Sequence, residues 1–192
     1  MAEAIGADAT ATIAGNSSTG DDVDLSATAT NTGDATIAGT TSTGSNIDLS
    51  ATADGAGSQA NLTASNSSGN SNAMDANATN GGDANITLNS QNGSFNSTTV
   101  TASGTDSDAD SFANASVGDF NTIDVDASGA DSQAGVALTS VTGSGNTLQA
   151  ESAADDSIAG VAGVGIDGGL NTVSANTAND AELALVGGVA ID

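Results

Sequence analysis

Short stretches in which apolar and polar residues alternate recur along the whole chain. Ala11 and Ile13 belong to one set of these stretches, and Val23, Leu25 and Ala27 belong to a second. A spacing of two residues places such side chains on one face of a β-strand. The alternation therefore predicts strands that bury one face and expose the other.

The alternating stretches fall into register when the sequence is divided into units of 24 or 25 residues. The units are residues 9–32, 33–56, 57–81, 82–105, 106–130, 131–154 and 155–179, with a partial unit at 180–192. Each unit holds two alternating stretches separated by turn-forming residues. This repeat predicts an all-β fold, a single β-solenoid domain over residues 1–192. We expect two strands per rung, about seven and a half rungs and uncapped ends. The composition alone favours disorder, but a disordered tract has no reason to keep this phase.

A glycine and an asparagine recur together in the turns. From the third unit onward the pattern is Gly-x-x-Asn-x-apolar-x-small, in which glycine supplies the positive φ of a corner. Asparagines stacked about 4.8 Å apart on successive rungs can pass amide hydrogen bonds along a column. We therefore expect a structural asparagine ladder at one corner of the solenoid. Its members are Asn72, Asn96, Asn121, Asn146 and Asn171.

The same pattern occurs together with Ser-Gln-Ala segments at 58–60 and 132–134. These motifs resemble the curlin repeat of bacterial curli-type functional amyloids, and the resemblance extends over nearly the whole chain. It implies strand–turn–strand rungs that stack into extracellular biofilm fibres.

The composition leaves few groups for chemistry. The chain contains no Lys, Arg, His, Cys, Pro, Trp or Tyr. Most nucleophiles, bases that titrate near neutral pH and soft metal ligands are therefore absent. A carboxylate pair can hydrolyse glycosides, but such sites use aromatic platforms, and this chain has three Phe residues. We predict that the protein is not an enzyme, with no catalytic residue and no organic cofactor.

The net charge of −24, unopposed by any cationic side chain, restricts the partners. Nucleic acids and anionic membrane surfaces are repelled, whereas cations are attracted. No apolar run approaches the roughly 20 residues of a membrane span, so we expect no membrane insertion. Residues 1–10 do not have the pattern of a secretory signal. We expect either a signal that has been removed or an export route that uses none.

Aspartates recur at the rung spacing and predict two acidic columns. The corner column contains Asp106, Asp131, Asp155 and Asp180. The second column, on the outer face of the second strand, contains Asp24, Asp48 and Asp75, with Asp124 further along. Carboxylates about 4.8 Å apart repel by roughly 0.9 kcal/mol in water and about 3.5 kcal/mol at an effective dielectric of 20. Such columns must bind cations, take up protons or be screened by salt. Calcium, which prefers oxygen ligands, is the candidate ion. The alternative is a solvated acidic face that keeps fibres apart.

The two ends of the chain each resemble part of a rung. We expect head-to-tail assembly, in which the C-terminal half-rung pairs with the N-terminal edge of the next copy. The residues predicted for this assembly edge are Leu183, Leu185, Val189 and Ile191. Because such contacts do not close, they yield a filament. The leading hypothesis is a structural subunit of a self-assembling fibre, outside the cell or on its surface. The alternative is a monomeric, cation-dependent repeat module of a larger surface adhesin.

Overall fold

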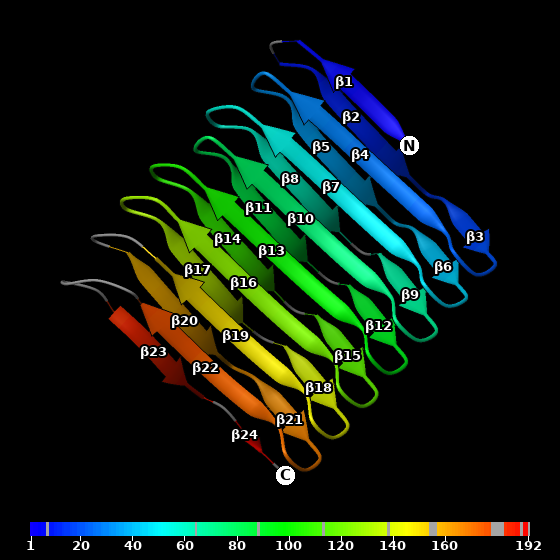
Figure 1. The fold of residues 1–192 in the computed structure, drawn as a ribbon, viewed down its shortest axis with the longest axis vertical. Coiled ribbons are helices and arrows are strands. Elements are labelled where there is room, and N and C mark those ends of the chain that lie inside the picture. The colour runs from blue at the N-terminus through cyan, green and yellow to red at the C-terminus, as the bar shows by residue number, and fades with distance from the viewer. Residues whose placement is uncertain are drawn as a thin grey trace.

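The protein is built from β-strands that wind into a solenoid (Figure 1). The structure, a computed structural model, describes residues 1–6, 8–63, 65–87, 89–112, 114–137, 139–153, 157–177, 183–188 and 190–191. Every regular element within these residues is a strand, and the strands form three parallel sheets of eight. The predicted all-β solenoid is therefore confirmed.

Each sheet takes one strand from each successive rung. Sheet A consists of β1 (Ala2–Ile5), β4 (Asp24–Thr30), β7 (Asp48–Asp54), β10 (Ala73–Thr79), β13 (Ser97–Ser103), β16 (Thr122–Ser128), β19 (Thr147–Ser152) and β22 (Thr172–Thr177). Sheet B consists of β2 (Thr10–Ala14), β5 (Asp34–Ala38), β8 (Gln59–Thr63), β11 (Asp83–Thr87), β14 (Asp108–Phe112), β17 (Gln133–Ala137), β20 (Ile158–Ala162) and β23 (Leu183–Gly187). Sheet C consists of β3 (Ser17–Thr19), β6 (Thr41–Thr43), β9 (Asn66–Ser68), β12 (Ser90–Asn92), β15 (Ala115–Val117), β18 (Ser140–Thr142), β21 (Gly165–Asp167) and β24 (Ala190–Ile191).

Each rung runs through sheet B, then sheet C, then sheet A, and the next rung repeats the path. Figure 1 shows the rungs side by side from the blue end to the red end, with sheet A in the near layer and sheet B behind it. Within sheet A, Ala27 pairs with Ala51 and Ala51 pairs with Ala76, which are 24 and 25 residues apart. The predicted repeat length is confirmed.

The rung contains one more strand than the sequence analysis predicted. Between sheets B and C the chain passes through a residue with positive φ, such as Gly15 and Gly39, each at +61°. One residue with a left-handed backbone interrupts the pleat. The layer opposite sheet A therefore divides into a five-residue strand of sheet B and a three-residue strand of sheet C. The residues of the short strand are mostly Ser, Thr and Asn, which are also common in turns.

The core lies between sheet A and the other two sheets. Ala35 and Ile37 of β5 are fully buried, and their rung equivalents are Ala60 and Leu62. Small residues allow the two layers to approach closely, and each buried Leu or Ile contributes about 1.5–3 kcal/mol. The largest fully buried side chains are Ile37, Ile47, Leu49, Leu62, Met74, Ile86, Ile123, Leu148, Val100, Val125, Val136 and Val141.

The core beneath sheet C is polar along much of its length. Ser42, Ser67, Gln91 and Ser116 are buried there. The hydroxyl of Thr98 donates to Oε1 of Gln91 at 2.9 Å, which joins sheet A to sheet C. The same column continues as Val141 and Ile166, so the core becomes apolar toward the later rungs.

Glycine is required at the turn between sheets C and A. Gly118 has φ +133°, and a Cβ placed there would lie 2.5 Å from the carbonyl carbon of Gly93. The equivalent glycines of neighbouring rungs stand in the same relation. The close rung spacing therefore excludes a side chain at this position.

We predict that Gly118→Ala destabilises the solenoid by about 2–4 kcal/mol, because it combines a disfavoured φ with overpacking. Urea unfolding measures the loss. Gly169→Ala is the matched control, since a Cβ at Gly169 meets nothing within 4 Å. Equal midpoints for the two variants would show that rung contact does not require the glycine.

Candidate functional site

The five predicted ladder asparagines lie in one column at the turn between sheets C and A. The backbone N–H of Asn96 donates to Oδ1 of Asn121 at 2.9 Å, and Nδ2 of Asn121 donates to the carbonyl oxygen of Gly118 at 2.8 Å. The same inter-rung bond, at 2.8–3.0 Å, joins Ile47 to Asn72, Asn72 to Asn96, Asn121 to Asn146 and Asn146 to Asn171.

The hydrogen bonds of this ladder differ from the predicted ones, which joined the side-chain amide of one asparagine to that of the next. Each carboxamide oxygen instead satisfies a main-chain donor of the preceding rung. Asn146 adds the amide link, from its Nδ2 to Oδ1 of Asn171 at 3.1 Å. Because Asn72, Asn96, Asn121 and Asn146 are buried, these bonds satisfy groups that water does not reach.

A second, shorter asparagine column was missed by the sequence analysis. It lies where the chain bends from sheet B into sheet C. The backbone N–H of Asn89 donates to Oδ1 of Asn114 at 2.9 Å, and Nδ2 of Asn114 donates to the carbonyl oxygen of Ile86 at 3.1 Å. Two asparagines 25 residues apart are a weak signal, because Ser65 and Thr139 occupy the adjoining rungs.

The acidic column on sheet A is shorter than predicted. Asp24 pairs with Asp48, but Asp48 then pairs with Ala73. Asp75 lies two residues further along its strand, beside Ser50. The rung lengthens from 24 to 25 residues at this point, and alignment of the buried Met74 with Leu49 sets the register. The prediction that Asp75 continues the column is therefore wrong.

Asp75 belongs to a different column of sheet A. There it pairs with Thr99, and Thr99 pairs with Asp124. Asp124 and Asp75 are thus separated by an uncharged residue rather than stacked. This interruption dilutes the repulsion between them.

At the turn between sheets A and B, Asp106 and Asp131 occupy adjacent rungs. Both have positive φ, +58° and +60°, and the N–H of Asp106 donates to the carbonyl oxygen of Ala130 at 3.0 Å. Asp155 and Asp180, the other predicted members, lie outside the described residues. Among the described residues, no group of three or more acidic side chains is arranged to hold a metal ion. Calcium binding stays a prediction.

Crowding on the strand faces shifts several carboxyl groups. Burial and, secondarily, Asp48 raise the pKa of Asp75, against a hydrogen bond from Thr99 that lowers it. Burial and then Asp24 raise the pKa of Asp48.

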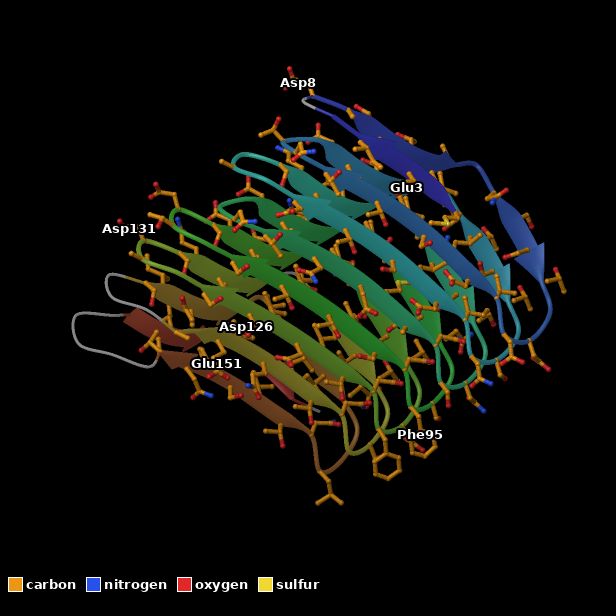
Figure 2. All side chains as sticks on the ribbon, turned by 45° about the horizontal axis from the view of Figure 1, so that its top comes forward. Glu3, Asp8, Phe95, Asp126, Asp131 and Glu151 are labelled. Atoms are coloured by element: carbon orange, nitrogen blue, oxygen red, sulfur yellow. The ribbon has the colours of Figure 1, made fainter. Side chains whose placement is uncertain are left out.

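A second crowded group lies around Glu151. Burial and then Glu151 raise the pKa of both Asp124 and Asp126. Figure 2 shows Asp126 and Glu151 together on sheet A, where they are paired. On sheet B, burial and neighbouring aspartates likewise raise the pKa of Asp108 and Asp110.

The outermost strands leave their hydrogen-bonding edges open. Among the described residues, no strand pairs with the outer side of β1, β2 or β3, or with that of β22, β23 or β24. At the second of these edges, Ala184 pairs with Ala159 and Val186 pairs with Val161, whose side chains are buried. Val186 is 48% exposed. The open edge therefore exposes residues that interior rungs bury.

The predicted edge residues Leu183, Leu185 and Ile191 lie on β23 and β24, the outermost strands of sheets B and C. Leu185 pairs with Gly160 in an outward-facing column, so Ala184 and Val186 face the core instead. The side chains of Leu183 and Ile191, and all of Val189, lie outside the described residues. Strand alternation puts Leu185 out of phase with the core.

No family model, curated protein or solved structure matches the chain. In the described part of the structure, no helix has the length and apolar character needed to cross a membrane. The fold and its columns thus define the protein as a β-solenoid.

We predict that Asn121→Ala lowers the free energy of unfolding by roughly 2–4 kcal/mol, because it leaves the buried N–H of Asn96 and the carbonyl of Gly118 without partners. Urea unfolding provides the measurement. Asn70→Ala is the control: Asn70 accepts from the N–H of Ser94 at 2.8 Å, but in an exposed turn that water can solvate. A loss no greater for Asn121 than for Asn70 would contradict a structural ladder.

We predict that mild acid stabilises the fold. A carboxyl group whose folded pKa is raised binds its proton more readily in the folded chain. As the pH falls from neutral toward the ordinary value of 3.8, the folded state takes up protons first, so the urea midpoint rises. Below 3.8 the unfolded chain is protonated as well, and this gain is complete.

Two substitutions test the origin of the pH effect. Asp75→Asn removes one raised carboxyl group and should flatten the rise in midpoint. Asp54→Asn should steepen the rise in midpoint. Hydrogen bonds from Thr79 and Asn80 lower the pKa of Asp54, so protonation of Asp54 in acid destabilises the fold. A midpoint that falls steadily from pH 7 to pH 4 would overturn the prediction.

Proposed function

We propose that this chain is a structural subunit of an extracellular, self-assembling fibre that grows by addition of β-strand edges. The observation that carries the proposal is the continuity of the buried columns up to the open edges. Interior residues such as Ile37 and Val161 are fully buried by the rungs on either side. Equivalent residues of the outermost rungs have such a neighbour on one side only.

A second copy supplies the missing neighbour in register. If β2 of one copy adds to β23 of another, Ala11 stacks on Ala184 and Ile13 stacks on Val186. These contacts continue the alanine column and the Ile/Leu/Val column of sheet B. In sheet A, addition of β1 to β22 stacks Ala2 on Ala175. Each contact removes apolar surface from water and pairs free main-chain groups.

The composition supports a mechanical role. The chain has no Lys, His or Cys with which to build most active sites, and no Lys or Arg at which trypsin cleaves. The motifs that resemble the curlin repeat favour a place in a biofilm matrix or surface filament. With a charge of −24 per copy, growth requires salt or bound cations such as calcium to screen repulsion. Nucleic acids and membranes are not among the partners that we propose.

A second candidate is a monomeric, cation-dependent module of a larger surface adhesin. The neighbouring carboxylates of Asp106 and Asp131, and of Asp24 and Asp48, favour it. Electron microscopy of the purified 192-residue chain, with millimolar calcium and with chelator, separates the two. Unbranched filaments with strands spaced about 4.8 Å along the axis support the fibre. Monodisperse single particles in both conditions support the module.

We predict that Thr12→Pro slows filament growth at least tenfold. The N–H of Asp34, which pairs with Thr10, points toward the preceding rung. By strand alternation the N–H of Thr12 points to the open edge, so proline removes an edge donor and no internal one. Light scattering and electron microscopy measure growth.

Thr12→Ala keeps the edge N–H and serves as the control. It should assemble at the rate of the unmodified chain. If Thr12→Pro assembles equally fast while remaining folded, growth does not proceed through the edge of β2.

A further inference from the structure

One side of the solenoid is almost free of charge. This uncharged side consists of five successive rungs of sheet C with the turns that flank them, in residues 39–46, 65–72, 89–96, 114–121 and 139–146; the equivalent segments of the rungs before and after carry Asp21, Asp22 and Asp167. Asp119 is the one acidic residue in these five segments. Figure 2 shows Phe95 at the turns of this side, while Asp8 and Asp131 lie at the turns near the other end of the strands. A chain with 24 acidic residues thus places one of them in the central five rungs of this side.

The uncharged side carries an exposed apolar ridge. Phe95 and Phe120 are 62% and 57% exposed, and their rings stack with centroids 5.4 Å apart and planes inclined by 10°. Val117, on the adjoining strand β15, is 44% exposed. Two rungs beyond Phe120 the same turn position holds Leu170, which is 93% exposed. The aromatic residues of this chain lie on its surface rather than in its core.

The backbone at the ridge is unfavourable for the residues it carries. Phe95, Phe120 and Leu170 have φ of +61°, +57° and +59°. Bulky side chains are disfavoured in this left-handed region. The same turn position in other rungs holds Asp22, Asn46, Ser71 and Gly145, residue types that tolerate it better.

Within the described part of the chain, the aromatic residues of the ridge contact each other and the turn of the next rung. Phe95 and Phe120 stack on each other, and the Phe120 ring lies over Gly145, where a Cβ would come within 2.7 Å of its Cδ1 and Cε1 atoms. Exposed residues in a disfavoured conformation incur a backbone cost that burial does not offset. Such an outlier points to a role outside the subunit.

We infer that the uncharged side is a lateral interface with a second copy of this chain, so that two solenoids lie side by side. The distribution of acidic residues indicates which partner binds this side. Two copies repel wherever sheet A or the turns between sheets A and B meet, because carboxylates face carboxylates within a Debye length of about 8 Å. The uncharged side lets copies approach without this repulsion, whereas a cationic partner is drawn to the acidic surfaces instead. Aromatic residues are enriched in protein interfaces.

Asp119 tunes this interface. In a two-fold arrangement the same side of each copy faces the other, so the two Asp119 carboxylates oppose pairing. Oδ1 of Asp119 accepts from the N–H of Ser144 at 2.7 Å, and Asn70 makes the same bond to Ser94. Asp119→Asn therefore preserves the turn while it removes the charge. Pairing should strengthen severalfold and lose part of its salt dependence.

The decisive variant is Phe95→Asn with Phe120→Asn, since Asn46 occupies the same turn position. It should weaken lateral pairing at least tenfold without lowering the unfolding temperature, because asparagine relieves the backbone. Phe112→Asn is the matched control. Phe112 is 42% exposed on the outer face of sheet B, outside the ridge and the five segments, and its loss should leave pairing unchanged.

Sedimentation equilibrium at 0.15 M salt measures pairing of the 192-residue chain below the concentration at which filaments form. The mass per unit length of filaments measures it above that concentration, and this second readout rests on the proposed fibre. Pairs, or filaments with the mass of two solenoids, that are lost in the Asn double variant support the inference. Monomers together with single-solenoid filaments overturn it, as does equal weakening by Phe112→Asn.

The two proposals fail separately. Absence of filaments with pairs still present removes the fibre but not the lateral interface. Filaments with the mass of one solenoid remove the lateral interface but not the fibre. A double variant that loses pairing and unfolds at a lower temperature also contradicts the inference, because the ridge would then serve the fold.

Discussion

In-register parallel pairing is the constraint on which the rest of this structure depends. Each residue of one rung lies beside its equivalent in the next, at the strand spacing of about 4.8 Å. Each position is therefore stacked on the equivalent positions of the neighbouring rungs, which often hold the same or a similar residue. Alanine columns pack closely, asparagine columns join main-chain donors of one rung to amides of the next, and aspartate columns repel. The stability of the molecule is the sum over columns of these like-with-like contacts.

The polar columns show how a protein with few large apolar residues holds together. The buried asparagines satisfy main-chain groups at the turns, where strand pairing does not reach them. Stacked glycines let successive turns approach until a Cβ would touch the carbonyl of the preceding rung. Carboxylates are mostly kept on outer faces, and uncharged residues such as Thr99 interrupt their columns. Small residues and satisfied amides thus take the place of a bulky core.

The same constraint links the fold to the proposed assembly. A column that ends at an open strand edge is unsatisfied there, and a second copy offers the matching residues. Axial growth uses the edges of the strands, whereas lateral pairing uses the uncharged side. In this proposal the distribution of charge separates the two directions, because carboxylates on sheet A and on the turns between sheets A and B oppose contact there. The assembly that we propose is therefore a fibre that grows in length and pairs with limited width.

The repeat length, the alternation of buried and exposed residues and the asparagine column were predictable from the sequence. Each depends only on the spacing of residues along the chain, which the sequence shows directly. The register of Asp75 was mispredicted although the spacing holds the signal: Asp75 follows Asp48 by 27 residues, two more than the 25-residue rung in which Met74 pairs with Leu49. The division of the layer opposite sheet A into sheets B and C depended on the backbone at Gly15 and Gly39, whose left-handed φ a sequence does not specify. Exposure of Phe95 and Phe120 ran against their hydrophobicity, since the solenoid turn places them outside the layers. Local periodicity therefore determined the class of fold, and contacts between rungs decided which residues stack and which face water.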